Sequence, residues 1–168
     1  MNKILITPTS SVVEADLKSA RLGTRFGRLD LSSQLALLAV ESLGVGFGKF
    51  ARDRVAICLA ARAGSLSTDF DFWQGRNAVG GPSPTLFAYT LPSAAIGEIA
   101  IRHRLTGPNL CFVGDDKTLL PEATDLIRRG EADSCVCVYC DVVNAGIEKM
   151  IHAAPAARAR AFFLTRDD

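Results

Sequence analysis

The stretch Ser83–Asp133, SPTLFAYTLPSAAIGEIAIRHRLTGPNLCFVGDDKTLLPEATDLIRRGEAD, decides the fold of this chain. Its pattern predicts a helix over Pro92–Leu105, a Gly-Pro turn, an apolar strand over Asn109–Val113, and a tight turn into a second helix. A strand that ends in a tight turn and continues as a helix is how many folds present a nucleophile. The turn here reads Gly-Asp-Asp at residues 114–116, with neither serine nor cysteine.

Strands and helices alternate along the rest of the chain. Arg54–Ala61 is a continuous apolar run bounded by charge, which is typical of a strand covered on both faces. Ser10–Arg28 is polar and interrupted by glycine, and it predicts a loop or a weak helix. The other predicted elements are strands over Lys3–Thr7, Ser134–Cys140 and Arg158–Thr165, and helices over Leu31–Leu43 and Ser65–Gly75. This alternation favours one α/β domain.

Composition narrows the class of protein. The 168 residues are 48% hydrophobic and 22% charged, which indicates a globular chain with a real core. A net charge of +1 gives little support for nucleic-acid binding. No apolar run approaches the roughly 18–20 residues that span a membrane, and the N-terminus is too weakly apolar for a secretory signal. We therefore expect a cytoplasmic protein.

The chain has five cysteines, an odd number that argues against a disulfide framework. The spacing Cys135-x-Cys137-x-x-Cys140 invites a metal-site interpretation. However, these residues lie in an apolar run of strand length, where free cysteines are usually buried. His103 and His152 are distant in sequence, whereas zinc normally needs four converging ligands. We predict a buried strand with no metal.

Several short segments, taken in order, point to a family. They are Ser83-Pro84, Thr90-Leu91-Pro92, Ala100-Ile101-Arg102, Gly107-Pro108-Asn109-Leu110 and Ile127-Arg128-Arg129-Gly130-Glu131-Ala132-Asp133. Together they resemble the N-terminal half of the β-ketoacyl-acyl-carrier-protein synthases, of the thiolase-like superfamily. Residues 31–36 and 54–57 fit that family's first long helix and next strand, and residues 159–164 fit its closing strand. The resemblance implies one α/β domain over residues 1–168, with a mixed five-stranded sheet flanked by helices and the C-terminal half absent.

The position of the family's nucleophilic cysteine is degenerate in this chain. Counting forward from Asn109 reaches Asp116, and counting backward from Ile127 reaches Val113, so neither alignment places a thiol there. Thioester exchange needs a thiolate, and a carboxylate at a helix N-terminus is a weaker nucleophile. We therefore interpret Asp115 and Asp116 as helix caps. Cys111 is a conceivable displaced nucleophile, but we expect it to be buried in its strand and inert.

The resemblance also bears on histidines and cofactors. The family's second half supplies two catalytic histidines, and neither His103 nor His152 matches their motifs. We expect His103 to be a surface or packing residue of its helix. Condensation by this chain alone is therefore not expected, and the resemblance implies no cofactor.

The resemblance further implies partners. The family's two-fold interface strand maps onto Asn109, Leu110, Cys111, Phe112 and Val113, so we expect pairing with a second copy or with a full-length ketosynthase. The loop before the Thr-Leu-Pro helix maps onto Leu86, Phe87, Tyr89 and Leu91. These four residues either line a partner's acyl pocket or pack in the chain's own core.

Three functions follow. The first is a catalytically silent ketosynthase-like accessory subunit of fatty-acid, polyketide or polyene biosynthesis, which supports or gates an active ketosynthase. The second is an enzyme, a decarboxylase or thioesterase acting on acyl- or malonyl-carrier thioesters through Asp116 or Cys111. The third is a module that binds acyl chains or an acyl carrier protein, whose acidic surface would meet Arg102, Arg104, Arg128 and Arg129.

Overall fold

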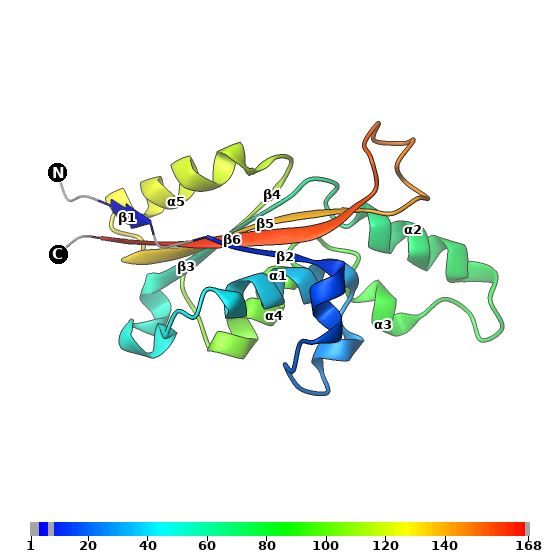
Figure 1. Cartoon of the computed structure of the whole chain (residues 1–168), viewed down its shortest axis with the longest axis horizontal. Helices are drawn as coiled ribbons and strands as arrows, with labels where there is room; N and C mark the ends of the chain where they lie inside the picture. The colour runs from blue at the N-terminus through cyan, green and yellow to red at the C-terminus, as the bar shows by residue number, and fades with distance from the viewer. Residues whose placement is uncertain (1–3, 7–8, 167–168) are drawn as a thin grey trace.

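A six-stranded sheet forms the centre of the molecule in the computed structural model, which describes residues 4–6 and 9–166 (Figure 1). Helices α1 and α4 lie below the sheet, α5 lies above it, and α2 and α3 extend from one end. The helices are α1 (Leu31–Ser42), α2 (Leu66–Gln74), α3 (Pro84–Phe87), α4 (Ala94–His103) and α5 (Leu119–Arg128). The strands are β1 (Ile4–Ile6), β2 (Ser10–Val13), β3 (Val55–Ala61), β4 (Asn109–Val113), β5 (Ser134–Val143) and β6 (Ala156–Arg166).

The sheet is mixed, as predicted. Its order is β1-β6-β5-β3-β4, with β3 parallel to both β4 and β5, and β6 antiparallel to its neighbours. β1 pairs with residues 164–166 of β6, and β2 pairs with residues 158–161 of the same strand. Two short strands thus share one edge position, which reconciles six strands with the five that were predicted. Lys3 and Thr7, which were assigned to the first strand, lie outside the described residues.

The prediction of a loop or weak helix at Ser10–Arg28 was wrong at its start, because Ser10–Val13 forms β2. Ser10 and Val12 point inward, and the Ser10 hydroxyl donates a hydrogen bond to the Ala39 carbonyl at 2.6 Å. Four residues give only two alternations of burial, too few to be recognised from sequence. Short 3-10 turns over Glu14–Lys18 and Phe26–Arg28 follow.

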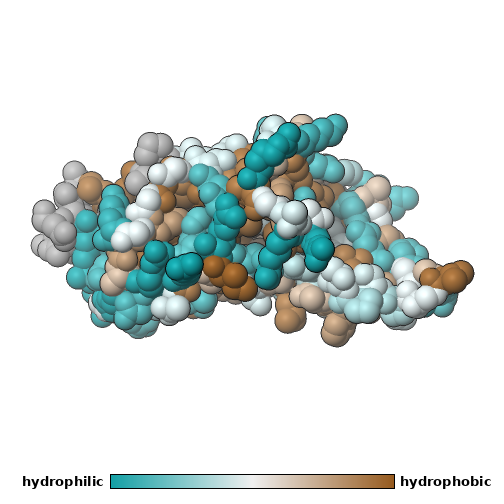
Figure 2. Space-filling view, turned by 90° about the horizontal axis from the view of Figure 1, so that it is seen from below, coloured by the Kyte–Doolittle hydropathy of each residue, from teal (hydrophilic) through white to brown (hydrophobic). Residues whose placement is uncertain are grey.

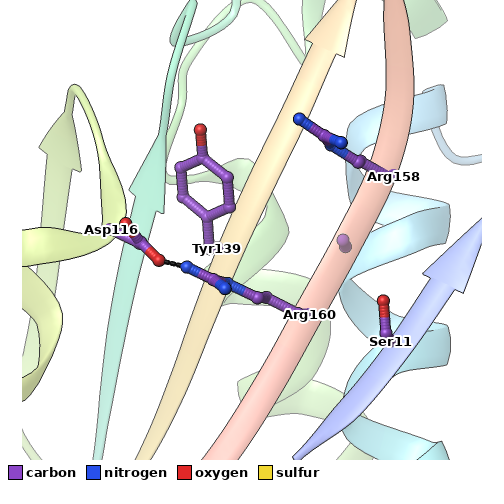
Figure 3. Close-up of a pocket in the computed structure, with 6 residues that line it drawn as sticks. Ser11, Asp116, Tyr139, Arg158 and Arg160 are labelled. Carbon is purple, nitrogen blue, oxygen red and sulfur yellow. Dashed lines mark ion pairs between the residues drawn. The ribbon is translucent and has the colours of Figure 1, made fainter.

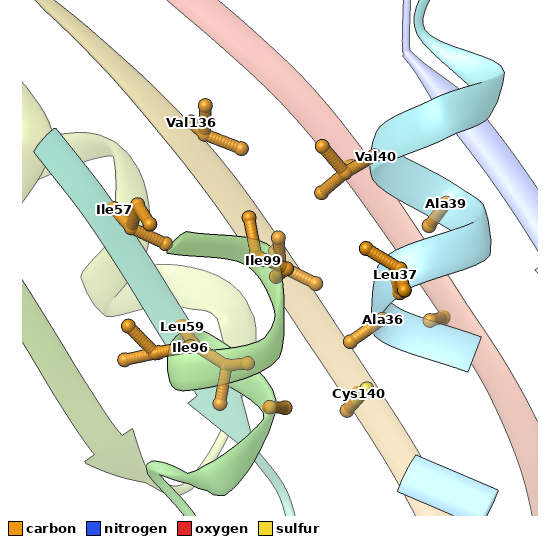
Figure 4. Packing of buried hydrophobic residues seen from close by; sticks show 14 of the residues in the cluster. Ala36, Leu37, Ala39, Val40, Ile57, Leu59, Ile96, Ile99, Val136 and Cys140 are labelled. Atoms are coloured by element: carbon orange, nitrogen blue, oxygen red, sulfur yellow. The ribbon is translucent and has the colours of Figure 1, made fainter. Parts of the chain in front are cut away.

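The lower face of the sheet carries the larger core cluster. Helix α1 begins at the Asp30 cap, whose carboxylate accepts a hydrogen bond from the Ser33 amide at 3.1 Å. Figure 4 shows α1 and α4 placing aliphatic side chains over β3 and β5. Val40, Ile99 and Ile57 belong to this cluster, and all three are at most 1% exposed. This packing fixes the helices beneath the parallel strands.

The upper face carries α5 on a floor of small side chains. Leu119, Ala123 and Leu126 follow helical spacing and are buried against Ala56, Ala60 and cysteines of β3 and β5. Small strand residues let the helix approach closely. Among the residues that the structure describes, no helix covers the upper side of the sheet beyond the N-terminus of α5 (Figure 1).

The predicted burial of the cysteine strand is confirmed. Cys135 and Cys137 belong to the upper cluster under α5, with their sulfurs 3.9 Å apart, whereas Cys140 belongs to the lower one. Side chains alternate along a strand, so an odd offset places Cys140 on the opposite face. The three thiols of the motif therefore cannot converge. Within the described residues, no group of three or more His, Cys, Asp or Glu side chains is placed to hold a metal.

Helices α2 and α3 form an extension with exposed apolar side chains. The base of α2 is tied to the loop after β5, where the Asn144 amide donates to the Ser67 carbonyl and the Asp71 carboxylate. Trp73 is 61% exposed, as is Phe87. Seen from below, separate hydrophobic patches are spread over the molecule, and one of them lies at the tip of the end where α2 and α3 lie (Figure 2). No helix among residues 4–6 and 9–166 is long and apolar enough to cross a membrane.

Candidate functional site

The turn after β4 presents acids at the start of a helix. Val113 ends the strand, and Gly114 follows with a φ of 146°, a conformation that favours glycine. The Asp115 carboxylate accepts a hydrogen bond from the Lys117 amide at 3.0 Å and caps a 3-10 turn over Asp116–Thr118. That turn runs directly into α5. The predicted capping is confirmed for Asp115 only.

Asp116 was wrongly interpreted as a cap, because it forms an ion pair with Arg160 of β6. Figure 3 shows the Arg160 side chain reaching from β6 across β5 to Asp116, with the Tyr139 ring beside the pair. In the strand order, β3 and β5 lie between β4 and β6. The pair therefore ties the turn after β4 to the far side of the sheet.

Two adjoining hollows open around this ion pair. One has a volume of about 380 Å³ and is polar, lined by Ser11, Asp116, Tyr139, Arg158, Ala159 and Arg160. The other has a volume of about 550 Å³ and is largely apolar, lined by Ile6, Thr9, Asp116, Lys117, Leu120, Pro121, Arg160 and Phe162. Asp116 and Arg160 line both hollows, so they stand at the junction. The junction lies at the turn that follows the carboxyl end of β4, and the carboxyl ends of strands are where α/β sheets usually bind ligands.

A buried carboxylate anchors the polar side of the site. Asp141 of β5 is 0% exposed and accepts two hydrogen bonds from Arg158, at 3.1 and 2.8 Å. Arg62, at the end of β3, approaches its other oxygen at 3.6 Å. The Tyr139 ring lies 5.5 Å from the Arg160 guanidinium, and burial raises the pKa of the Tyr139 hydroxyl. Three guanidinium groups thus face two carboxylates.

Comparison with known proteins shows which solved structures share this fold. No family model matches the sequence, and no curated protein matches it. Among solved structures, the ishigamide ketosynthase/chain length factor matches at a TM-score of 0.76 and 20% identity. The ketosynthase ApeO in complex with its chain length factor ApeC, from Xenorhabdus doucetiae, matches at 0.71 and 18%. A β-ketoacyl synthase from Burkholderia phymatum matches at 0.74 and 11%.

These matches cover 96%, 99% and 99% of this chain. The chain has a ketosynthase fold. It spans 62% of the length of the ishigamide protein, 80% of the Xenorhabdus chain and 60% of the Burkholderia one. The predicted resemblance to β-ketoacyl synthases is therefore confirmed at the level of the fold.

Neither Asp116 nor Val113, the two positions that we aligned with the family's cysteine, carries a thiol. Cys58, Cys135 and Cys137 are buried beneath α5, and desolvation raises the pKa of Cys137 well above its ordinary value. Cys111 was predicted to be buried, which was wrong, because β4 is an edge strand and the residue is exposed. Desolvation by its surroundings still raises the pKa of the Cys111 thiol, which disfavours the thiolate.

Neither His103 nor His152 lines the hollows around Asp116. His103 ends α4, where its ring meets Phe47 edge-on with centroids 4.7 Å apart, and burial lowers its pKa. It is a packing residue, as predicted. His152 lies in the loop between β5 and β6 and has a positive φ of 50°.

The four residues predicted either to line a partner's pocket or to pack in the chain's own core divide into two pairs. Tyr89 packs against the lower core, and its hydroxyl lies 3.2 Å from a Glu98 oxygen, while Leu86 is half-buried. Phe87 and Leu91 are 61% and 64% exposed. The Phe87 ring contacts that of Phe72 at 5.4 Å between centroids. The exposed pair is the one free to meet another protein.

The predicted carrier-binding arginines do not form one surface. Arg102 and Arg104 lie at the end of α4, while Arg128 and Arg129 lie at the end of α5, on the opposite face of the sheet. Arg102 pairs with Glu41 at 2.7 Å. Arg129 pairs with Asp125 at 2.9 Å. Each pair of arginines is thus a separate helix terminus, where cations suit the helix dipole.

Sequence reasoning missed the polar side of the site. Arg62, Tyr139, Asp141, Arg158 and Arg160 were not among the predicted site residues. The available signal was the alternation Arg158-Ala-Arg160-Ala within an otherwise apolar strand, which places both arginines on one face. The complementary signal on the neighbouring strand was Asp141, a single acidic residue at the end of the apolar run of β5, which could pair with these arginines.

Proposed function

We propose that this chain is a catalytically silent ketosynthase-like subunit that supports or gates an active ketosynthase in fatty-acid, polyketide or polyene biosynthesis. The observation that carries the proposal is Asp116. It is one of the two positions, Asp116 and Val113, that the resemblance aligns with the family's cysteine, and it is bound to Arg160. A carboxylate held in an ion pair, with no thiol nearby, cannot carry an acyl group as a thioester.

Two of the similar structures contain a ketosynthase with a chain length factor. A third contains a type II polyketide acyl-carrier protein in complex with its ketosynthase, at 12% identity and a TM-score of 0.76. By analogy, this chain would act in the cytoplasm beside a full-length ketosynthase, with an acyl carrier protein visiting the assembly. A homodimer is the competing arrangement.

The edge strand β4 supports pairing. The Ile57 amide donates to the Pro108 carbonyl at 2.9 Å, and the Gly114 amide donates to the Ala61 carbonyl at 3.0 Å. In a parallel ladder, these two bonds mean that residues 108, 110, 112 and 114 direct their backbone groups toward β3. The amides and carbonyls of residues 109, 111 and 113 therefore point toward the open edge. A partner strand can add there, since an exposed edge is a template for pairing. Phe87 and Leu91 would contribute apolar contacts.

Co-expression tests the proposal. The chain is produced with the full-length ketosynthase encoded nearest to its own gene, and the pair is analysed by affinity capture and size-exclusion chromatography. We expect a stoichiometric complex and a changed product chain length when the chain is removed. Phe87→Glu should weaken the complex, whereas Arg28→Glu, on an exposed 3-10 turn, should not. Absence of any complex together with unchanged products would reject the proposal.

The enzyme alternative has a direct assay. Purified chain is incubated with malonyl- and acyl-carrier thioesters, and hydrolysis and decarboxylation are followed beside Asp116→Ala and Cys111→Ala. We expect all three proteins to match the background rate. Turnover by the unaltered chain that is lost in either variant would show that the chain is an enzyme, and it would reject the proposal that the subunit is catalytically silent.

A further inference from the structure

The side chains in and behind the polar hollow carry an excess of positive charge. Arg160 pairs with Asp116, whereas Arg62 and Arg158 share Asp141 behind the hollow, so one guanidinium charge is not matched by a carboxylate. Nearby Lys117 is matched by Asp115 at 3.5 Å. An additional anion would therefore complete the charge balance of the site.

Arg160 is the residue placed to bind that anion. Its side chain is 48% exposed, and it lines both the polar and the apolar hollow. A guanidinium has five donors, and one carboxylate cannot use all of them. The Tyr139 ring beneath it limits its orientation. Arg160 thus retains donors that face open space.

The second hollow supplies a surface for hydrocarbon. Its walls include Ile6, Leu120, Pro121 and Phe162, and Ile6 is 55% exposed and Leu120 42% exposed. The volumes of the two hollows, about 380 and 550 Å³, each match the range of small-ligand sites, roughly 300–1,000 Å³. Because the hollows meet at Arg160, a ligand with a charged end and an apolar end can occupy both.

We propose that this chain binds a free amphipathic carboxylic acid, with its carboxylate on Arg160 and its hydrocarbon chain over Ile6, Leu120 and Phe162. The ligand is a carboxylate because the arginines of this site already hold carboxylates, those of Asp116 and Asp141. Arg158 supports the polar end and is committed to Asp141 by two hydrogen bonds. The inference does not depend on the proposed pairing with a ketosynthase, since the site lies within one chain.

Asp116 then acts as an internal competitor for the ligand. Its carboxylate occupies Arg160 in the unliganded chain, so binding requires Arg160 to share or exchange its partner. This arrangement predicts opposite effects on ligand affinity for substitutions at the two residues. Removing the positive charge at residue 160 weakens binding, whereas removing the negative charge at residue 116 strengthens it.

Isothermal titration of the purified chain with decanoate tests the proposal. Decanol provides the tail without the charge, and acetate provides the charge without the tail. We expect decanoate to bind at least about tenfold more tightly than decanol, since a hydrogen bond to a charged group has that worth. It should also bind at least about tenfold more tightly than acetate, because burial of the hydrocarbon chain adds to the affinity. Arg160→Gln should weaken decanoate binding about tenfold. Asp116→Asn should tighten it, and Arg28→Gln, a matched change on an exposed turn elsewhere, should leave it unchanged.

Each outcome decides the matter. Decanoate that binds Arg160→Gln as tightly as the unaltered chain would overturn the proposal, as would equal binding of decanol or no binding of decanoate. Thermal melts establish that every variant is folded before titration. Asp116→Asn provides a gain of affinity, which a misfolded variant cannot mimic.

Discussion

Arg158 and Arg160 stand two residues apart on β6 and project to the same face, yet their ion pairs differ in depth. Arg158 holds Asp141, which is 0% exposed, whereas Arg160 holds Asp116, whose side chain is 30% exposed. A carboxylate stripped of water depends on its partner far more than one that water can reach. The two arginines therefore contribute differently to stability despite identical chemistry.

Arg158→Met should lower the free energy of unfolding by about 1.5–3 kcal/mol, because it leaves the buried Asp141 carboxylate with only the longer contact to Arg62. Arg160→Met is the matched control and should cost less than about 1 kcal/mol, the range of exposed pairs. Urea denaturation of both variants measures the difference. Equal losses would mean that Asp141 does not depend on Arg158.

Asp133 gives a pH-dependent contribution at the opposite end of the sheet. Arg54 donates hydrogen bonds to both Asp133 oxygens, at 3.1 and 2.9 Å, and holds the pKa of that carboxyl below its usual 3.8. A depressed pKa stabilises the fold above the unfolded value, and the contribution is lost as pH falls through the folded value. The unfolding free energies of the unaltered chain and Asp133→Asn should therefore differ by a constant amount at neutral pH and converge below pH 3.8. A gap that persists unchanged into strong acid would contradict this.

Among the secondary-structure elements, two glycines show how position decides the effect of one methyl group. A Cβ on Gly107 would lie 2.3 Å from the Val55 carbonyl oxygen, which is backbone at the start of β3. A Cβ on Gly97, inside α4, would meet nothing within 4 Å. The turn before β4 thus needs glycine for space, and α4 does not.

Gly97→Ala should raise the free energy of unfolding by about 0.5–1 kcal/mol, because alanine loses less entropy in a helix. Gly107→Ala should lower it by at least about 1–3 kcal/mol, because β3 must shift to relieve the overlap. Chemical denaturation of the two proteins, which carry the same added methyl, measures both signs. A neutral Gly107→Ala would show that the turn before β4 can move independently of β3.

How much of this could be predicted from sequence depends on the range of the interactions. The long elements were predictable, because apolar runs such as Arg54–Ala61 and a capped helix such as α1 carry local signals. β2 was not, because it is short and stabilised by pairing with β6. The burial of Cys111 was mispredicted because β4 and β3 look equally apolar, and only the sheet order shows that β4 is an edge. The Asp116–Arg160 pair joins distant segments, and no local pattern encodes such a contact.

At the scale of the whole molecule, β4 is the strand through which we propose that a second protein pairs with this chain. Cys111 stands at the centre of its open edge, with its amide directed away from β3 by the phase of the ladder. Proline removes that donor while leaving the bonds to β3 in place, and edge strands tolerate it. A single substitution at Cys111 can thus remove the capacity to pair without unfolding the chain.

Cys111→Pro should abolish formation of the complex with a ketosynthase, or of a homodimer, while shifting the melting temperature by only a few degrees. Cys111→Ser retains the amide and removes only the thiol, so it should pair like the unaltered chain. Sedimentation velocity of the three proteins, alone and with the co-expressed ketosynthase, measures both outcomes. If Cys111→Pro still pairs, the partner meets another surface, and the exposed Phe87 and Leu91 of the α2–α3 extension become the contact to test. If Cys111→Ser also fails to pair, the thiol rather than the strand makes the contact.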